Sequence, residues 1–183
     1  MKQFESDLAS ILSKREGSYV LAAAGGELGE VSFNVHKNHL DGSSIHKETM
    51  GRDADGYEIK VPLVRIDDVL KENKVDGPYL LKVDVQGAEL AALDGAQHTL
   101  LKTEIVVLEV SLFEFMVGAP QFDEVIVYMK ERDFVVFDII HGWNRPLDNA
   151  LGQVDIVFVK EKGMFRSDHS YSTIEQMRAM FSE

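Results

Sequence analysis

Two carboxylates, Asp84 and Glu109, stand at equivalent places in this 183-residue sequence, each directly after an apolar run of strand length. The segment between them is rich in helix-forming residues, so Tyr79–Glu109 is expected to fold as strand, turn, helix, strand. Parallel strands joined by a right-handed crossover end at the same edge of a sheet, about 4.8 Å apart. The two carboxylates would then share one crevice, and their repulsion would raise the proton affinity of one of them. This pattern is typical of a site for proton abstraction.

Each polar residue of this segment also has a structural interpretation. Asp84 suits an acceptor molecule or an ammonium group, or else caps the turn by accepting bonds from the Gln86-Gly87 backbone. Glu109 orients the acceptor or acts as the base, or else bonds to neighbouring loop amides. Lys82 is expected to form a structural ion pair, because a lysine in a central strand needs a partner. Glu89, at a helix start, is the second choice for catalysis.

A third candidate, His141, opens the segment His141-Gly142-Trp143-Asn144-Arg145. The segment follows a strand that should run parallel to the central ones, which would place it over the same edge as Asp84. An imidazole, an indole and a guanidinium together suit a sugar or another polyhydroxylated acceptor, with His141 as a base. The alternative is an ordinary exposed loop.

The rest of the chain predicts an α/β domain around this central unit. The apolar periodicity indicates helices and strands in a mixed order. Helices are expected at 5–15, 66–74, 88–101 with a break at Gly95, and 122–132, and strands at 19–23, 30–35, 58–64, 134–139 and 154–159. The last two strands are predicted to form an antiparallel pair, and residues 164–183 a tail with a short helix.

Composition narrows the function classes. A formal net charge of −12 without clustered Lys and Arg argues against nucleic-acid binding, since phosphate contacts need concentrated positive charge. The chain has no cysteine and no long apolar run, which excludes disulfides, thiolate chemistry and a membrane segment and favours a cytoplasmic protein. The spacing of His36, His39 and His46 fits no metal framework, so no metal is expected. Asp53–Gly56 is interpreted as a turn rather than a calcium loop.

The run KVDVQGAE around Asp84, with VPLVRIDDVL before it and LEV and GQVDIVFVKE after it, resembles the FkbM family of S-adenosylmethionine-dependent methyltransferases. The resemblance implies a Rossmann-like methyltransferase sheet, mostly parallel with an antiparallel C-terminal strand. It further implies an O-methyltransferase for a hydroxyl of a small molecule, sugar or natural product. By this resemblance Glu5 binds the ribose hydroxyls of the cofactor and Ala23 and Ala24 lie beside its adenine, with Asp84 and Gln86 as further cofactor-binding residues.

The sequence departs from the family at one place. The family has a first strand and a glycine-rich loop that hold the methionine part of the cofactor, and nothing of that kind precedes Phe4. Residues 1–163 are therefore expected to form a methyltransferase-like domain without its first βα unit, which would expose an apolar edge and favour self-association. The alternative function is a non-catalytic relative that serves as a binding or assembly module.

Overall fold

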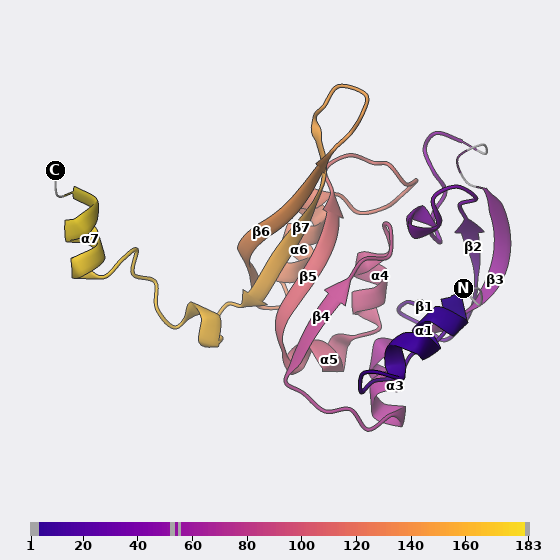
Figure 1. Ribbon diagram of the computed structural model, residues 1–183, viewed down its shortest axis with the longest axis horizontal. Coiled ribbons are helices and arrows are strands. Elements are labelled where there is room, and N and C mark those ends of the chain that lie inside the picture. The colour runs from indigo at the N-terminus through magenta and orange to yellow at the C-terminus, as the bar shows by residue number, and fades with distance from the viewer. Residues whose placement is uncertain (1–3, 52–53, 55, 182–183) are drawn as a thin grey trace.

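Two β-sheets lie side by side in the structure, which is a computed structural model that describes residues 4–51, 54 and 56–181 (Figure 1). The expected turn at Asp53–Gly56 includes residues 53 and 55, which lie outside the described residues. In chain order, with η for a 3₁₀ helix, the elements are α1 (Glu5–Leu12), β1 (Ala23–Ala24), β2 (Gly29–Val35), η2 (Leu40–Gly42), β3 (Tyr57–Val64), α3 (Ile66–Glu72), β4 (Tyr79–Val83), α4 (Glu89–Asp94), α5 (Gln97–Leu101), β5 (Thr103–Ser111), α6 (Phe122–Lys130), β6 (Phe134–Asn144), β7 (Leu151–Lys160), η3 (Met164–Arg166) and α7 (Ile174–Phe181).

The central sheet has four strands in the order β4-β5-β7-β6. β4 and β5 are parallel, and β7 is antiparallel to both β5 and β6. Three strands therefore run in one direction and the C-terminal strand β7 opposes them, as predicted. The helical segment between β4 and β5 is broken at Gly95 into α4 and α5, also as predicted. A crossover of this length is what a parallel pair requires.

The second sheet, ordered β1-β3-β2, corrects the expectation of one continuous sheet. β1 has only two residues, so the strand expected at 19–23 forms only at its end. Within the described residues, no strand pairs with the outer edge of β4. The sheets are instead joined where Gly25 meets Gly95, because a Cβ at Gly95 would lie 2.1 Å from the Gly25 carbonyl oxygen. This backbone contact holds the two sheets together without a shared strand.

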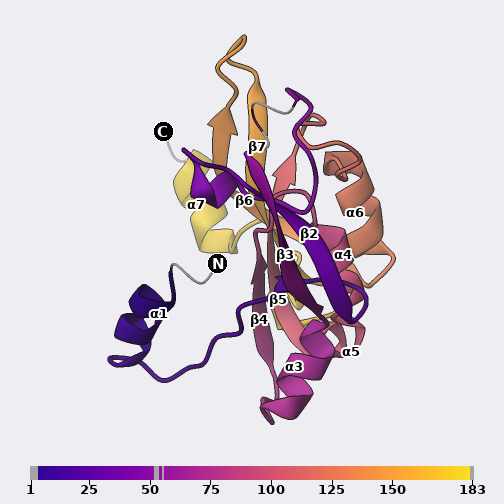
Figure 2. The same ribbon diagram turned by 90° about the vertical axis from the view of Figure 1, so that its right-hand side faces the viewer.

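The hydrophobic core lies between the central sheet and α4, α5 and α6. Its largest fully buried side chains include Phe134, Phe158, Leu93 and Leu108. Figure 2 shows α4 and α6 on one side of this sheet, whereas α1 and α7 stand apart on the other side. The sheet thus has one covered face, and its other face, with the strand ends, carries the polar residues of the site.

Two segments, α1 and β6, differ from their predictions in where they end. α1 ends at Leu12 rather than Arg15, and β6 continues to Asn144 rather than Ile139. β6 therefore includes His141, which was expected in a loop. The tail forms α7, whose Ile174 and Phe181 are exposed, and residues 182–183 lie outside the described part. In the described chain, every helix is too short or too polar to span a bilayer.

Asp67 ties α3 to α5 and so connects the two halves of the molecule. Its Oδ1 accepts bonds from the Thr99 backbone N–H at 2.8 Å and hydroxyl at 2.7 Å, and its Oδ2 accepts the His98 N–H at 3.0 Å. Burial alone would raise the pKa of Asp67, but these bonds outweigh it and lower the pKa. The carboxylate form is therefore stabilised in the folded chain.

Asp67→Ala is expected to lower the free energy of unfolding by about 1–3 kcal/mol, because two backbone donors lose their acceptor. Since the folded pKa is lowered, this stabilisation is present above the unfolded pKa and is lost as the pH falls through the folded value. Urea unfolding at neutral and acidic pH measures both effects. Asp68→Ala, at the adjacent exposed carboxylate, is the control and should change stability by no more than about 0.5 kcal/mol. Equal losses in the two variants would contradict the assigned role.

Candidate functional site

The parallel register of β4 and β5 brings Asp84 and Glu109 together. Val83 lies opposite Leu108, so the next residues of both strands are neighbours at the carboxyl edge. The Gln86 side-chain amide joins them, because its Nε2 donates to Glu109 Oε2 at 2.8 Å and to Asp84 Oδ1 at 3.2 Å. One amide nitrogen thus bridges two carboxylates that would otherwise repel each other.

A tight turn holds Gln86 in this position. Gln86 and Gly87 both have positive φ angles, of 51° and 94°, and a Cβ at Gly87 would lie 2.7 Å from Ala119 Cβ. Glu89 Oε1 accepts the N–H groups of Val85 and Gly87, each at 3.1 Å. The Ser44 hydroxyl donates to the Gln86 carbonyl at 2.6 Å. A left-handed conformation of a non-glycine residue persists only where its surroundings determine it, as they do here.

These bonds bear on the alternative roles that the sequence left open for Asp84 and for Glu89. The Gly87 N–H donates to Glu89, and Asp84 accepts from the side chains of Gln86 and Lys82. Glu89 is buried, which raises its pKa despite the backbone bonds that it accepts. Glu89 therefore fixes the turn, while the Asp84 side chain remains 43% exposed at the strand end.

Glu109 is the electrostatically unusual group of the site. Burial, and then the nearby charge of Asp84, raise its pKa from 4.5 to about 7, although the bond from Gln86 opposes this shift. A general base is most effective when its pKa is close to the working pH. At neutral pH a large fraction of Glu109 is therefore ready to accept a proton.

The raised pKa also predicts that Glu109 costs stability when it ionises. The stability of the fold that goes with protonated Glu109 is fully present below the unfolded pKa. It is lost as the pH rises through about 7, the folded pKa. Glu109→Gln mimics the protonated form, so at about pH 8 it should raise the free energy of unfolding by about 1 kcal/mol after solvent screening, with no gain at about pH 4. Chemical denaturation at the two pH values measures this difference. A gain of equal size at both would show that ionisation is not the cause.

Lys82 has the structural ion pair that its place in the strand predicted. Its Nζ lies 3.1 Å from Asp84 Oδ2 and 3.7 Å from Asp155 Oδ1. Burial lowers the pKa of Lys82, but the bond to Asp84 and the surrounding carboxylates outweigh it and raise the pKa. Because Asp155 lies opposite Glu109 on β7, this lysine faces three acidic groups of one sheet edge.

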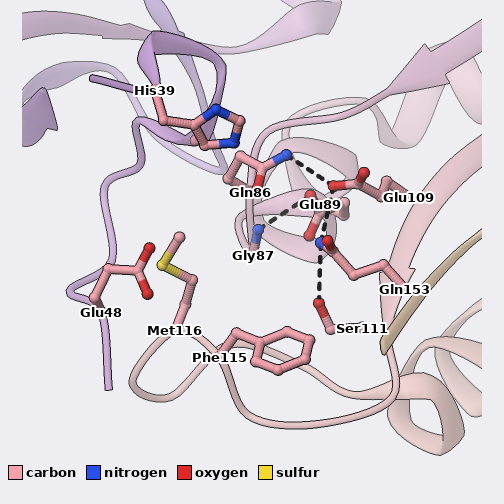
Figure 3. Close-up of a pocket in the computed structure, with 11 residues that line it drawn as sticks. His39, Glu48, Gln86, Gly87, Glu89, Glu109, Ser111, Phe115, Met116 and Gln153 are labelled. Atoms are coloured by element: carbon pink, nitrogen blue, oxygen red, sulfur yellow. Dashed lines mark hydrogen bonds between the residues drawn. The ribbon is translucent and has the colours of Figure 1, made fainter. Parts of the chain in front are cut away.

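A cavity of about 210 Å³ opens beside Glu109 (Figure 3). Its lining residues are His39, Gly42, Glu48, Gln86, Gly87, Glu89, Glu109, Ser111, Phe115, Met116 and Gln153. Gln153 Nε2 donates to Glu109 Oε2 at 3.1 Å, so two amides converge on the same carboxylate oxygen. The cavity therefore has a polar wall formed by side chains from three separate elements.

Gln153 and Ser111 were not among the predicted site residues. They lie opposite each other in the antiparallel register of β5 and β7. A signal was present in the sequence, because Gln153 and Asp155 alternate with the apolar residues Val154 and Ile156. In a strand with one covered face, this alternation places the polar pair on the same face as Glu109.

His141 takes a place different from the loop over Asp84 that its sequence position predicted. It pairs with Asp155 within β6, at the far edge of the sheet. This position is two strands away from Glu109, roughly 10 Å at the usual strand spacing. The exposed ring packs against Trp143, with centroids 4.2 Å apart, and it does not line the 210 Å³ cavity. His141 lies in a strand rather than in a loop because β6 continues to Asn144.

Asp84 does not line this cavity itself, and neither do Glu5, Ala23 and Ala24. Glu5 is exposed on α1 and accepts a 3.5 Å hydrogen bond from the Tyr19 hydroxyl. Ala23 and Ala24 form β1, where they pair with Leu63 and Val64, and Ala24 packs against the core. Among the described residues these side chains form no single cluster with Asp84.

The histidines of the segment before β3 have local partners. His36 Nε2 lies 3.4 Å from Glu48 Oε1, and His46 Nδ1 lies 3.1 Å from the Val117 carbonyl oxygen. Over the described ranges, no group of three or more His, Cys, Asp and Glu side chains is arranged to hold a metal ion.

Comparison with known proteins gives one match. Residues 5–136 match the family model described as the methyltransferase FkbM domain. No curated protein and no solved structure matches the chain. The matched range covers well over half of the sequence and includes Asp84, Gln86 and Glu109, whereas His141 and Gln153 lie beyond it.

Proposed function

The chain belongs to the FkbM methyltransferase family, and from this premise we propose that it transfers a methyl group from S-adenosylmethionine to a hydroxyl oxygen of a small molecule, such as a sugar or another natural product. The observation that carries the proposal is Glu109, a carboxylate with a pKa of about 7 in the wall of a cavity. Oxygen methylation needs a base for the hydroxyl proton, and Glu109 has the basicity for that step at neutral pH.

The residues around Asp84 fit one part of the cofactor. S-adenosylmethionine carries positive charge on its sulfonium and ammonium groups. In the protein, Asp84, Glu109 and Asp155 form an acidic cluster, and Lys82 is the counter-ion of this cluster. A cation is stabilised beside such carboxylates. Asp84, half exposed at the strand end, is the residue that would hold the cationic part. When bound, the cofactor supplies an electrophilic methyl carbon.

The roles of the protein side chains follow from their contacts. Gln86 and Gln153 donate to one oxygen of Glu109, which fixes the carboxylate and leaves its second oxygen for the acceptor hydroxyl. Glu109 would take the proton of an acceptor hydroxyl whose oxygen receives the methyl group, while the bond between that group and the cofactor sulfur would break and S-adenosylhomocysteine would leave. Phe115 and Met116 form the apolar wall of the cavity and limit the access of water. Most of the rate increase in such a displacement comes from holding the reactants in line.

A second candidate function is a binding module without catalysis. It is favoured by the separation of Glu5, Ala23 and Ala24 from the cavity beside Glu109. If these residues are needed to hold the ribose and adenine, the described arrangement would bind the cofactor only weakly.

Two experiments together distinguish the two candidate functions. The first is calorimetric titration with S-adenosylhomocysteine, and the second is a mass-spectrometric assay for methyl transfer to a panel of hydroxyl compounds. Saturable binding with methylated product would support the methyltransferase. Absence of both with folded protein would favour the binding module. Binding without transfer to any hydroxyl in the panel would count against oxygen methylation.

A further inference from the structure

A second and larger cavity of about 770 Å³ adjoins the Glu109 pocket. It lies between the segment after β5 and the β6–β7 connection. Its lining residues are Thr49, Met50, Phe113, Glu114, Phe115, Trp143, Asn144, Arg145, Pro146, Leu147, Gly152 and Gln153. Its volume is within the range of about 300–1,000 Å³ that is usual for small-molecule sites, whereas 210 Å³ holds only a small group.

Phe115 and Gln153 connect the two spaces, because both residues line both cavities. The Phe115 ring lies against β7 at Gly152, where a Cβ would be 3.2 Å from its Cζ. The glycine therefore gives the ring room beside the strand. Gln153 presents its amide to Glu109 in the small pocket. One ligand that passes Phe115 can thus occupy both spaces.

The walls of the larger cavity are mainly aromatic and aliphatic. Phe113, Phe115 and Trp143 contribute rings, and Trp143 is 46% exposed. Met50 and Leu147 also line this cavity and are 86% and 83% exposed, so these large apolar side chains lie at its rim. Rings and apolar chains of this kind anchor ligands through buried area and stacking.

The charged groups near this cavity argue against an anionic ligand. The Arg145 guanidinium is engaged by Asp148 through bonds of 2.8 and 2.5 Å and lies 3.9 Å over the Phe113 ring. Glu114 adds a negative charge to the lining, and Glu109 and Glu89 stand in the adjoining pocket. A ligand carboxylate or phosphate would be repelled by this arrangement.

We propose that the 770 Å³ cavity binds the apolar, ring-containing body of a neutral acceptor whose hydroxyl group reaches Glu109 in the small pocket. This inference rests on the proposed methyltransferase function and narrows its substrate class. A free sugar fits less well, because several of its hydroxyl groups would lose water against a mainly apolar wall that offers few partners. Selectivity comes from Phe113, Phe115 and Trp143, and the chemistry from Glu109.

Three probes of matched size test the class: 2-naphthol, 2-naphthoate with the same rings and an anionic group, and methyl β-glucopyranoside with a polyhydroxylated ring. Calorimetry on the full chain should show saturable binding of 2-naphthol and at least about tenfold weaker binding of the other two. Trp143→Ala should weaken 2-naphthol binding about tenfold, since an aromatic contact of this kind is lost. Leu147→Asp, at the exposed rim, is a second variant with little risk to folding. Val127→Ala removes an exposed apolar side chain from α6 and should leave binding unchanged.

Tighter binding of the glucoside than of 2-naphthol, or equal binding by Trp143→Ala and the unmodified chain, would overturn the inference. Methylation of the glucoside without naphthol binding would overturn it too, while leaving the proposed function intact. Naphthol binding that depends on Trp143, in a chain that transfers no methyl group, would support the cavity assignment and remove the proposed function. The test therefore distinguishes failure of the cavity proposal from failure of the proposed methyltransferase function.

Discussion

Glu109→Gln is expected to lower kcat for methyl transfer at least about 100-fold, which is the low end of what a positioned general base contributes. The amide keeps the size of the side chain and can still accept bonds from Gln86 and Gln153, but it cannot take the hydroxyl proton. The unmodified enzyme should show a rate that rises with pH through about 7 as Glu109 ionises. The variant should lack this rise, and steady-state kinetics over a pH series measure both effects.

The matched control is Glu104→Gln, on the same strand β5 at its opposite end. It removes one carboxylate without touching the cavity, so kcat should stay within about twofold of the unmodified value. If Glu109→Gln retained both the rate and its dependence on pH, the proton would have another acceptor and the mechanism would be wrong.

Asp84→Asn is expected to weaken cofactor binding by about 10- to 100-fold, the equivalent of one charged hydrogen bond. Asp84→Ala, which also removes the bridge to Gln86, is expected to abolish turnover with the fold retained. Titration with both S-adenosylmethionine and S-adenosylhomocysteine locates the contact. An equal loss for both compounds indicates the ammonium group, because the homocysteine form has no sulfonium charge.

Asp84→Asn has a second expected effect, on Glu109. The charge of Asp84 is one cause of the raised pKa of Glu109, so its removal should lower that pKa and shift the pH–rate profile to lower pH. Asp76→Asn, an exposed carboxylate just before β4, is the control and should shift neither quantity. Unchanged cofactor affinity together with an unchanged profile would remove Asp84 from the site.

The central unit could be predicted from the sequence because its signals are local. Apolar runs of strand length, a helical segment between them and the right-handed crossover rule are enough to place Asp84 beside Glu109. The turn that holds Gln86 is equally local, since Gly87 and Glu89 follow within three residues. The bond from Ser44 to the Gln86 carbonyl, in contrast, comes from a residue 42 positions away in the chain.

The contribution of β7 and the length of β6 depend on long-range pairing. Gln153 reaches Glu109 only through the register between β5 and β7, which no local pattern specifies. β6 stays paired as far as Asn144 through several register shifts, and most of its residues are exposed on both faces. Without a buried face, the alternation that identifies a strand is absent, so the sequence predicts a loop at His141.

The division into two sheets could not be predicted for a related reason. β1 forms only two residues of strand, and its partner β3 lies some forty residues later in the chain. The contact between Gly25 and Gly95 that joins the sheets is a close approach of two backbone segments. Such an approach requires glycine, but the sequence does not show which two glycines meet.

Because β4 is the outer strand of its sheet, Lys82 also bears on how the protein associates with other molecules of its kind. An open strand edge offers its peptide groups to strands of other molecules, and a lysine in its middle is a common natural guard against such stacking. Lys82 stands between the two-thirds exposed Leu80 and the catalytic candidate Asp84. The same positive charge therefore balances the acidic site, and it is expected to limit the strand-to-strand self-association that the open edge of β4 would otherwise favour.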